Sequence, residues 1–274
     1  MKYVFTMLVL VFGFCQSVNA NLLVSPTRIA FEDRDRVKDI ILINVTEQTR
    51  SYRIEWQENT TDDFGNYILL ADNDVSFASS DYIRYSPRQV TLKPGERQAI
   101  KLMLRRKSDM DLPEYRSHLK VTALPTAPST NAESTDEGID FKINVLTSYT
   151  VPVIVRNQKS NANLSLNDIK VNVKNEEKVF FEIDLGKTGT TSINGDINVS
   201  AIDPQTGQSE TIGILRGINV FHEKDRRVIK VEWQGFTVPK NIRVRIDFIG
   251  ANEQIGQNFL SVTKDISIND YVRT

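Results

Sequence analysis

The chain has 274 residues, of which 40% are hydrophobic and 25% are charged, so it can bury one large core or two of ordinary size. Lys and Arg total 34 against 35 Asp and Glu, and this balance leaves no basic surface for nucleic acid. Two histidines and one cysteine exclude a structural zinc site, an iron–sulfur cluster and a disulfide within the chain.

Residues 1–20 have the pattern of a secretory signal peptide. Lys2 precedes an apolar run from Tyr3 to Phe14, and the small residues that follow predict cleavage before Asn21. A membrane anchor is the alternative, but the run is about a dozen residues, short of the ~20 that span a bilayer. We therefore expect a soluble mature chain outside the cytoplasm, without cysteine and without membrane insertion.

Apolar and polar residues alternate with a period of two through the mature chain, which predicts a mostly β protein. In the first half this alternation predicts strands at Leu22–Phe31, Asp39–Val45, Ser51–Gln57, Gln98–Leu104 and Tyr115–Leu124. Turn signals separate them, and Lys93-Pro94-Gly95-Glu96 is the clearest. No helical apolar stripe of useful length interrupts the pattern.

A loop and a long strand end the first half. Residues Pro125–Gly138 lack a bulky apolar side chain and predict a mobile hairpin loop. The longest alternating run follows, from Phe141 to Arg156, and it is uncharged from Ile143 to Val151. An uncharged run of alternating apolar residues is typical of an edge strand that pairs with another chain. The pattern alone favours the alternative, in which the same residues face the protein's own core.

The polar segment Asn157–Asn163 resembles a hinge between two compact units. After it the β pattern resumes, with strands predicted at Leu164–Val173, Val179–Leu185, Gly195–Ala201, Glu210–Val220, Arg227–Trp233, Arg243–Ile249 and Gln254–Thr263. About seven short strands in each half predict an all-β fold of two immunoglobulin-like sandwiches. We place the first domain at residues 21–157 and the second at residues 158–274.

Residues able to carry catalysis are sparse. His118 and His222 stand in no metal-binding or nucleophile motif, so a structural or surface role is the expectation for each. The carboxylate pairs Asp62-Asp63 and Glu176-Glu177 have the pattern of solvated turns. The sequence therefore predicts no enzyme activity, no metal and no cofactor.

Four segments, taken in their order along the chain, resemble the PapD-like family of periplasmic pilus-assembly chaperones. They are Val24–Phe31, Leu92–Glu96, Tyr115–Leu119 and Val151–Arg156. The resemblance implies two immunoglobulin-like domains in an L-shaped arrangement. It also implies a periplasmic protein that binds, folds and caps fimbrial subunits by donor-strand complementation and delivers them to an outer-membrane usher.

The resemblance further implies which residues touch the subunit. The donor strand would insert Ile143, Val145, Thr147 and Tyr149 into the subunit's groove. Thr147 is smaller than the family's pattern expects, which suggests a shallower pocket in the partner.

Members of the family anchor the subunit's terminal carboxylate with two cations in the cleft between the domains. Arg28 matches the first cation, whereas the usual position of the second is Pro152 in this chain. Either another cation works with Arg28, or the chain belongs to a divergent branch with a reshaped cleft. The alternative for Arg28 is a surface ion pair with Glu32 or Asp33.

The family also fixes the angle between its domains with a salt-bridge network. The resemblance points to Arg156, Glu114 and Asp247 as structural members of that network. The expected partners are fimbrial subunits and the usher, together with a second copy of the chain through the capping strand when no subunit is bound. The other function left open is an extracellular two-domain adhesin or structural surface protein, whose ladder would be internal.

Overall fold

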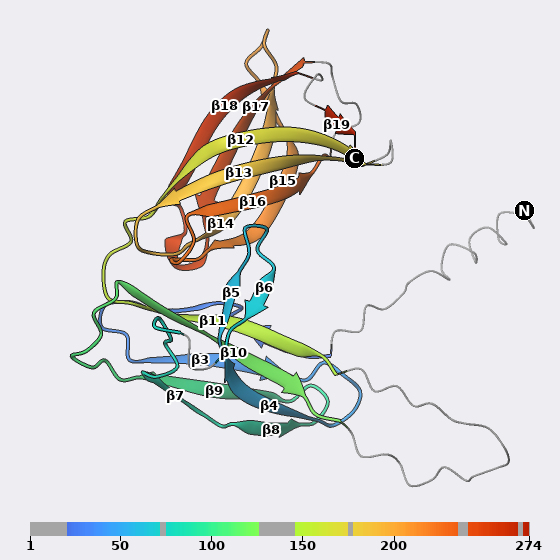
Figure 1. Ribbon diagram of the computed structural model, residues 1–274. Coiled ribbons are helices and arrows are strands. Elements are labelled where there is room, and N and C mark those ends of the chain that lie inside the picture. Colours follow the sequence, from blue (N-terminus) through green and yellow to red (C-terminus); the bar gives the residue numbers. More distant parts are fainter. Residues whose placement is uncertain are drawn as a thin grey trace, which may run out of the picture.

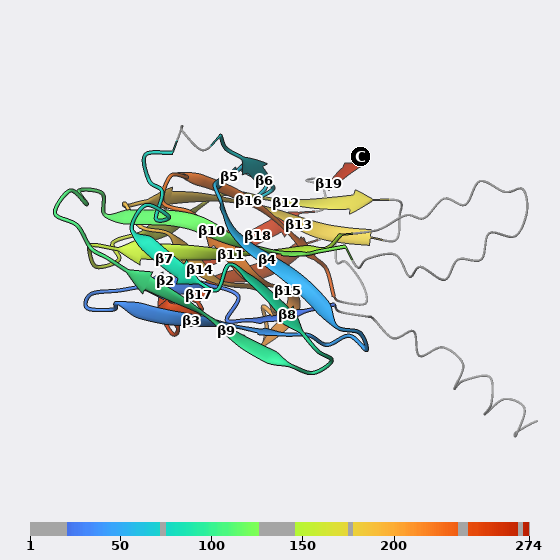
Figure 2. The same ribbon diagram turned by 90° about the horizontal axis from the view of Figure 1, so that it is seen from below.

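The computed structural model describes residues 21–71, 75–125, 146–174, 178–234, 241–267 and 271–273. The predicted signal peptide, most of the predicted loop at Pro125–Gly138, and Glu176-Glu177 lie outside these residues, as does the first part of the predicted strand Phe141–Arg156. The chain folds as two β-sandwiches (Figure 1 and Figure 2).

The first sandwich packs a four-stranded sheet against a five-stranded one. The four-stranded sheet has the order β1-β3-β9-β7, formed by Leu23–Ser25, Val37–Ile43, Arg97–Leu104 and Ile83–Ser86. The five-stranded sheet has the order β2-β11-β10-β4-β8, formed by Ile29–Phe31, Ser148–Arg156, Glu114–Ala123, Arg50–Gln57 and Gln89–Leu92.

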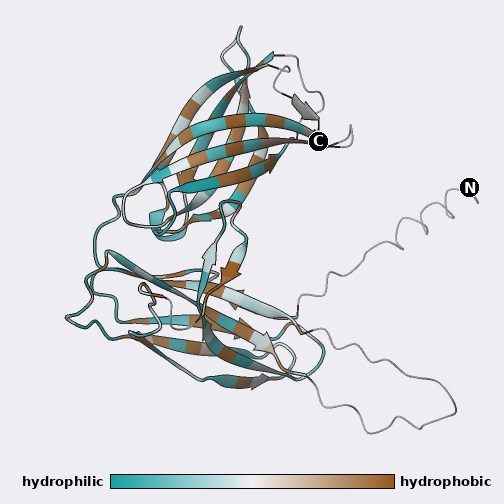
Figure 3. Cartoon of the chain, viewed as in Figure 1, coloured by the Kyte–Doolittle hydropathy of each residue, from teal (hydrophilic) through white to brown (hydrophobic). Residues whose placement is uncertain are grey.

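Alternation places every second side chain of these strands in a common core. Ile40 pairs with Ile100 across β3 and β9, and both side chains are fully buried. Tyr52 and Ile54 of β4 enter the same core, as their spacing predicts. Figure 3 shows the resulting change of hydropathy from residue to residue along the strands.

The predicted strand Leu22–Phe31 is broken in the structure. Its first part, β1, pairs with β3 in one sheet, and its second part, β2, pairs with β11 in the other. Pro26 lies between them and has no N–H to donate, so it cannot continue a ladder. The chain therefore crosses from one sheet to the other within this segment.

The second sandwich consists of two four-stranded sheets. One has the order β16-β13-β12-β19, formed by Arg226–Glu232, Lys178–Thr188, Asn163–Lys174 and Tyr271–Arg273. The other has the order β15-β14-β17-β18, formed by Ser209–Val220, Ile193–Ile202, Asn241–Gly250 and Asn258–Ser267. The last predicted strand, Gln254–Thr263, begins too early, because Gln254 belongs to a 3-10 turn, Asn252–Gln254.

Each sandwich has its own hydrophobic core. The first core runs from Leu22 to Val155 along the chain, and the second runs from Ala162 to Ile266. The predicted domain boundary, between residues 157 and 158, falls in the interval that separates the two cores.

A two-stranded hairpin, which the sequence pattern did not predict, extends from the first sandwich to the second (Figure 1). Its strands are β5 (Asn59–Thr61) and β6 (Tyr67–Leu69). The carbonyl oxygen of Asp63, in its turn, accepts a hydrogen bond of 2.7 Å from the N–H of Val228. The Asp63 carboxylate also pairs with Arg226, so the predicted solvated turn contacts the second sandwich.

Candidate functional site

Strand β11, the described part of the predicted donor strand, has two different ends. From Val153 to Val155 it pairs with β10 on one side and with β2 on the other. Ser148–Pro152 also pairs with β10, but no other described strand pairs with its opposite side. The first half of β11 is therefore an open sheet edge within the described structure.

The side chains of the predicted donor strand share one face of β11. Tyr149 is half-buried and packs on the first core, whose members Val151, Val153 and Val155 lie on the same face. Thr147 precedes β11 on this face and is half-buried. Ile143 and Val145 lie outside the described residues. For the described part, the ladder faces the chain's own core, as the alternative interpretation of the pattern requires.

The opposite face of β10 and β11 carries buried charge and lies against the second sandwich. Arg116 of β10 has no exposed surface, and its guanidinium lies 3.9 Å from the ring centroid of Phe221. The same guanidinium hydrogen-bonds Glu223 of the second sandwich. A cation enclosed by a ring and a carboxylate of the other domain ties the two sandwiches together.

Arg156, at the end of β11, joins three carboxylates from both sandwiches. Its guanidinium lies 3.1 Å from Glu114, 2.8 Å from Glu32 and 3.1 Å from Glu253. Glu114 is fully buried and accepts hydrogen bonds from the N–H and the hydroxyl of Ser192 in the second sandwich. Burial favours a lower pKa for Arg156, but Glu114 and Glu253 outweigh it and raise that pKa.

The other predicted member of the network, Asp247, lies elsewhere. It is on β17 and contacts Arg245 of the same strand and Ser261 of the neighbouring strand β18. Both partners belong to its own sheet, so these contacts do not cross between the sandwiches. An acidic residue of the second sandwich that does cross to Arg28 and Arg156 is Glu253, in the 3-10 turn between β17 and β18.

Arg28 is buried at the domain interface, with a side chain that is 2% exposed. Its Nε donates to Glu253 at 3.0 Å, and its Nη1 donates to Oδ1 of Asn219 at 2.7 Å. Burial lowers the pKa of Arg28 despite the neighbouring carboxylates. The alternative of a surface ion pair with Glu32 or Asp33 is therefore wrong, because the carboxylate on Arg28 comes from the second sandwich. The anchoring of a subunit's carboxylate stays a prediction.

Both histidines lie at the domain interface in structural positions. His118 is opposite Pro152 in the β10–β11 ladder, and Nη1 of Arg116 lies 3.2 Å from its Nδ1. Burial, aided by the Arg116 charge, lowers the pKa of His118 to about 2. The pKa of His222 is lowered by burial as well, although Glu223 and Glu114 act in the opposite direction.

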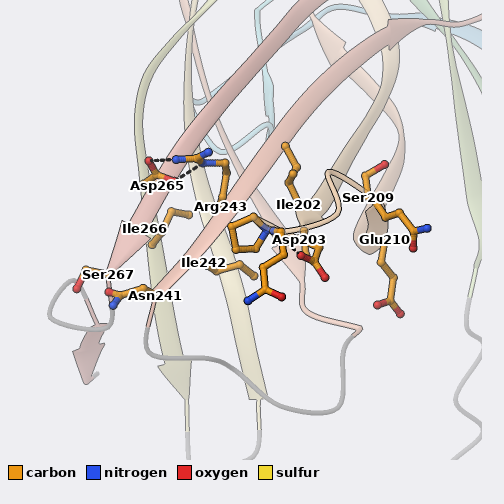
Figure 4. Close-up of a pocket in the computed structure, with 14 residues that line it drawn as sticks. Ile202, Asp203, Ser209, Glu210, Asn241, Ile242, Arg243, Asp265, Ile266 and Ser267 are labelled. Atoms are coloured by element: carbon orange, nitrogen blue, oxygen red, sulfur yellow. Dashed lines mark hydrogen bonds and ion pairs between the residues drawn. The ribbon is translucent and has the colours of Figure 1, made fainter.

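A cavity in the second sandwich is lined by other residues than these. It has a volume of about 860 Å³ and lies at one end of the β15-β14-β17-β18 sheet, beside Ile242 and Ile266 (Figure 4). The Arg243–Asp265 ion pair closes part of its rim at 2.7 Å. None of the predicted site residues that the structure describes lines it.

The described residues were compared with the requirements of a metal site and of a membrane-spanning helix. They contain no cluster of three or more histidine, cysteine, aspartate or glutamate residues arranged to hold a metal ion. They also contain no helix with the length and hydropathy needed to cross a membrane.

The chain is similar to known proteins in structure and not in sequence. No family model and no curated protein matches the chain. The crystal structure of the YadV chaperone has 11% sequence identity and a TM-score of 0.46, and the match covers 90% of this chain and 100% of that one. A chain of the CsuC–CsuE complex of a chaperone and a tip adhesion subunit, from Csu pili of Acinetobacter baumannii, has 13% identity and a TM-score of 0.44 over 90% of this chain and 98% of that one.

A chain of the Salmonella enterica complex between the SafA pilin and the SafB chaperone has 12% identity and a TM-score of 0.42. That match covers 89% of this chain and 96% of the other. Identities of 11% to 13% with TM-scores of 0.42 to 0.46 are too low to carry a functional conclusion. The candidate functional site is therefore defined by the contacts of this chain's own residues.

Proposed function

We propose that the chain is a periplasmic chaperone, exported by a cleaved signal peptide, that caps fimbrial subunits by strand addition and delivers them to an outer-membrane usher. The observation that carries the proposal is the open edge of β11 at Ser148–Pro152. An open edge offers unpaired backbone N–H and C=O groups, which an extended segment of another chain can pair with.

The side chains of the same strand give the edge its specificity. Val151, Val153 and Val155 fix the strand in the first core, and Tyr149 and Thr147 continue this face toward the edge of the sandwich. In our proposal Ile143 and Val145 extend the face into the groove of an incomplete subunit. Alternate side chains in pockets then supply the apolar part of the binding.

The buried network supports the proposal by holding the strand's other end. Arg156 is the last residue of β11 and contacts Glu114 of the first sandwich and Glu253 of the second. We propose that Arg156 and Glu114 fix the angle between the sandwiches, so that the open edge is presented in one orientation. A rigid binding edge loses less conformational freedom when a partner binds.

Capture of a subunit by two matched variants tests the proposal. Val145→Asp places a charge on the predicted inserting face, whereas Thr150→Asp places one on the opposite face, beside Lys120 of β10. The probe is a fimbrial subunit encoded beside this chain, co-expressed and co-purified, and circular dichroism checks the fold. We expect Val145→Asp to abolish capture and Thr150→Asp to retain it.

Three outcomes contradict the proposal. Undiminished capture by Val145→Asp would mean that this face does not enter the subunit. Loss of folding by Val145→Asp would mean that residue 145 belongs to the chain's own core, as in the adhesin alternative. Absence of capture by the wild-type chain would remove the chaperone function itself.

A further inference from the structure

One carboxylate, that of Glu253, lies between two buried guanidinium groups. Its Oε1 is 3.0 Å from Nε of Arg28 and 3.1 Å from Nη2 of Arg156. Arg28 comes from the segment before β2, Arg156 ends β11, and Glu253 belongs to the other sandwich. A single internal side chain therefore satisfies two cations of the first sandwich at the domain interface.

The turn that carries Glu253 is held rigidly on β14. The side chain of Gln254 is buried, accepts a hydrogen bond from the N–H of Asn194 at 2.8 Å and donates one to the carbonyl oxygen of Ser192 at 3.0 Å. Asn252 donates to Oδ1 of Asn194 at 2.6 Å. Because both of its neighbours in the turn are fixed, Glu253 is already positioned beside Arg28 and Arg156. A carboxylate from another molecule would lose translational and rotational freedom on binding there, and Glu253 does not.

Glu253 is more exposed than Arg28 and borders a cavity that Arg28 does not line. A cavity of about 310 Å³ at the domain junction is lined by Arg156, Lys159 and Glu253, among others, but not by Arg28. The side chain of Glu253 is 12% exposed, against 2% for Arg28. The Glu253 carboxylate therefore borders the cavity, while Arg28, its hydrogen-bond partner, does not.

Arg28 retains one donor without a partner. Its Nη2 is buried and makes no hydrogen bond among the described residues. Its Nε and Nη1 are taken by Glu253 and Asn219. The site thus has the donors of a carboxylate-binding pair, and an internal carboxylate occupies the part of it that faces the cavity.

We propose that Glu253 acts as a built-in carboxylate that fills the Arg28–Arg156 site and excludes carboxylate ligands from it. A subunit's terminal carboxylate then reaches Arg28 only after Glu253 has left. This consequence for a subunit rests on the proposed function, whereas the occupancy of the site does not. Glu253 is accordingly a specificity-determining residue. While its carboxylate is bound to Arg28 and Arg156, the edge of β11 pairs with its partner and no carboxylate of that partner binds the two arginines.

Acetate, used as the probe, tests the occupancy without a subunit. The full mature chain is labelled with ¹⁵N, and the Arg28 Nε–Hε signal, assigned by its loss in Arg28→Lys, is followed as acetate replaces chloride at constant ionic strength. In wild type we expect no saturable shift. Glu253→Gln keeps the size of the side chain but removes its charge, so acetate should bind at least about tenfold more tightly than to wild type.

A matched variant and a second substitution keep the result unambiguous. Asp265→Asn removes a carboxylate from the distant, exposed pair with Arg243 and should behave as wild type. Glu253→Asp withdraws the carboxylate by one methylene and should give intermediate acetate binding, which decides the question if Glu253→Gln does not fold.

Saturable acetate binding at Arg28 of equal strength in wild type and Glu253→Gln would overturn the inference, because Glu253 would then exclude nothing. No binding to either Glu253 variant would also overturn it, because no carboxylate site would exist. Failure of the proposed function is distinguishable, since it appears as absent subunit capture while the acetate result is unchanged.

Discussion

The two ends of β11 have the same backbone conformation but different surroundings. Val151–Arg156 is buried throughout, and its part Val153–Val155 pairs with strands on both sides. Ser148–Thr150 is half-buried or exposed and pairs on one side only. The comparison shows how one strand can be both fixed and available: the buried end supplies stability, and the open end keeps unpaired backbone groups for a partner.

The largest predicted effect removes the charge that holds the buried end. Arg156→Ala leaves Glu114 buried without its cation, and we expect the free energy of unfolding to fall by about 3–5 kcal/mol. Urea unfolding measures it. Arg243→Ala, which breaks an exposed pair, is the control and should have no measurable effect. A loss below about 1 kcal/mol for Arg156→Ala would contradict a stabilising role of the network.

The second prediction compares truncations at the two ends of the strand. Ile154 is fully buried, and Ile154→Ala should lower the free energy of unfolding by about 2–5 kcal/mol. Thr147 is half-buried beyond β11, and Thr147→Ala should stay within about 0.5 kcal/mol of wild type. Equal losses, measured by the same urea titration, would show that the two ends are equally embedded in the fold.

Acidification provides the third test of the buried end. The pKa of His118 is lowered to about 2 from 6.5, so the unfolded chain binds the proton first as the pH falls. This contribution to stability is complete above pH 6.5 and is lost between there and about pH 2, by at most about 1.4 kcal/mol per pH unit. His222, whose pKa is also lowered, acts with the same sign.

His118→Gln removes that titration and keeps an acceptor for Arg116. Unfolding titrations from neutral pH down to about pH 4 should therefore show a shallower loss of stability in this variant than in wild type. An identical pH dependence of the two proteins would mean that His118 is not held neutral by its surroundings.

The smallest predicted effect concerns the hairpin β5–β6, which braces the interface. Gly65 and Gly95 both have positive φ, +77° and +72°, so alanine strains the backbone at each. Only at Gly65 would the added Cβ also collide with Arg227 of the second sandwich. Gly65→Ala should therefore destabilise the chain by about 0.5–1 kcal/mol more than Gly95→Ala in urea unfolding. Equal effects would mean that the close approach of Gly65 to Arg227 does not constrain the interface.

Strands with a regular alternation could be predicted from the sequence, because a period of two is a local property. Ile100, Leu102 and Leu104 stand at every second position and are buried, whereas Lys101 and Met103 between them are exposed. The hairpin β5–β6 escaped prediction because its strands have only three residues each and Tyr67–Leu69 is apolar without alternation. A strand of three residues carries too little periodicity to be recognised.

The charges at the interface required the three-dimensional structure. Arg28 and Glu253 are 225 residues apart in the chain, and no local pattern joins them. The alternative partners of Arg28, Glu32 and Asp33, are its neighbours in sequence, but Glu32 pairs with Arg156 instead. The family resemblance implies Arg156, Glu114 and Asp247 as members of one network. Arg156 does contact Glu114, but the second-sandwich carboxylate on Arg156 is that of Glu253 and not that of Asp247.

Backbone amide exchange along β11, with and without a bound subunit, tests the central claim most directly. The chain is compared alone and in complex with a co-expressed fimbrial subunit. We expect exchange at residues 146–150 to slow strongly in the complex, because new inter-chain hydrogen bonds form there, while Val153–Arg156 is already protected in the free chain. Unchanged exchange at residues 146–150 in a stable complex would show that the subunit binds elsewhere and that β11 is not the donor strand.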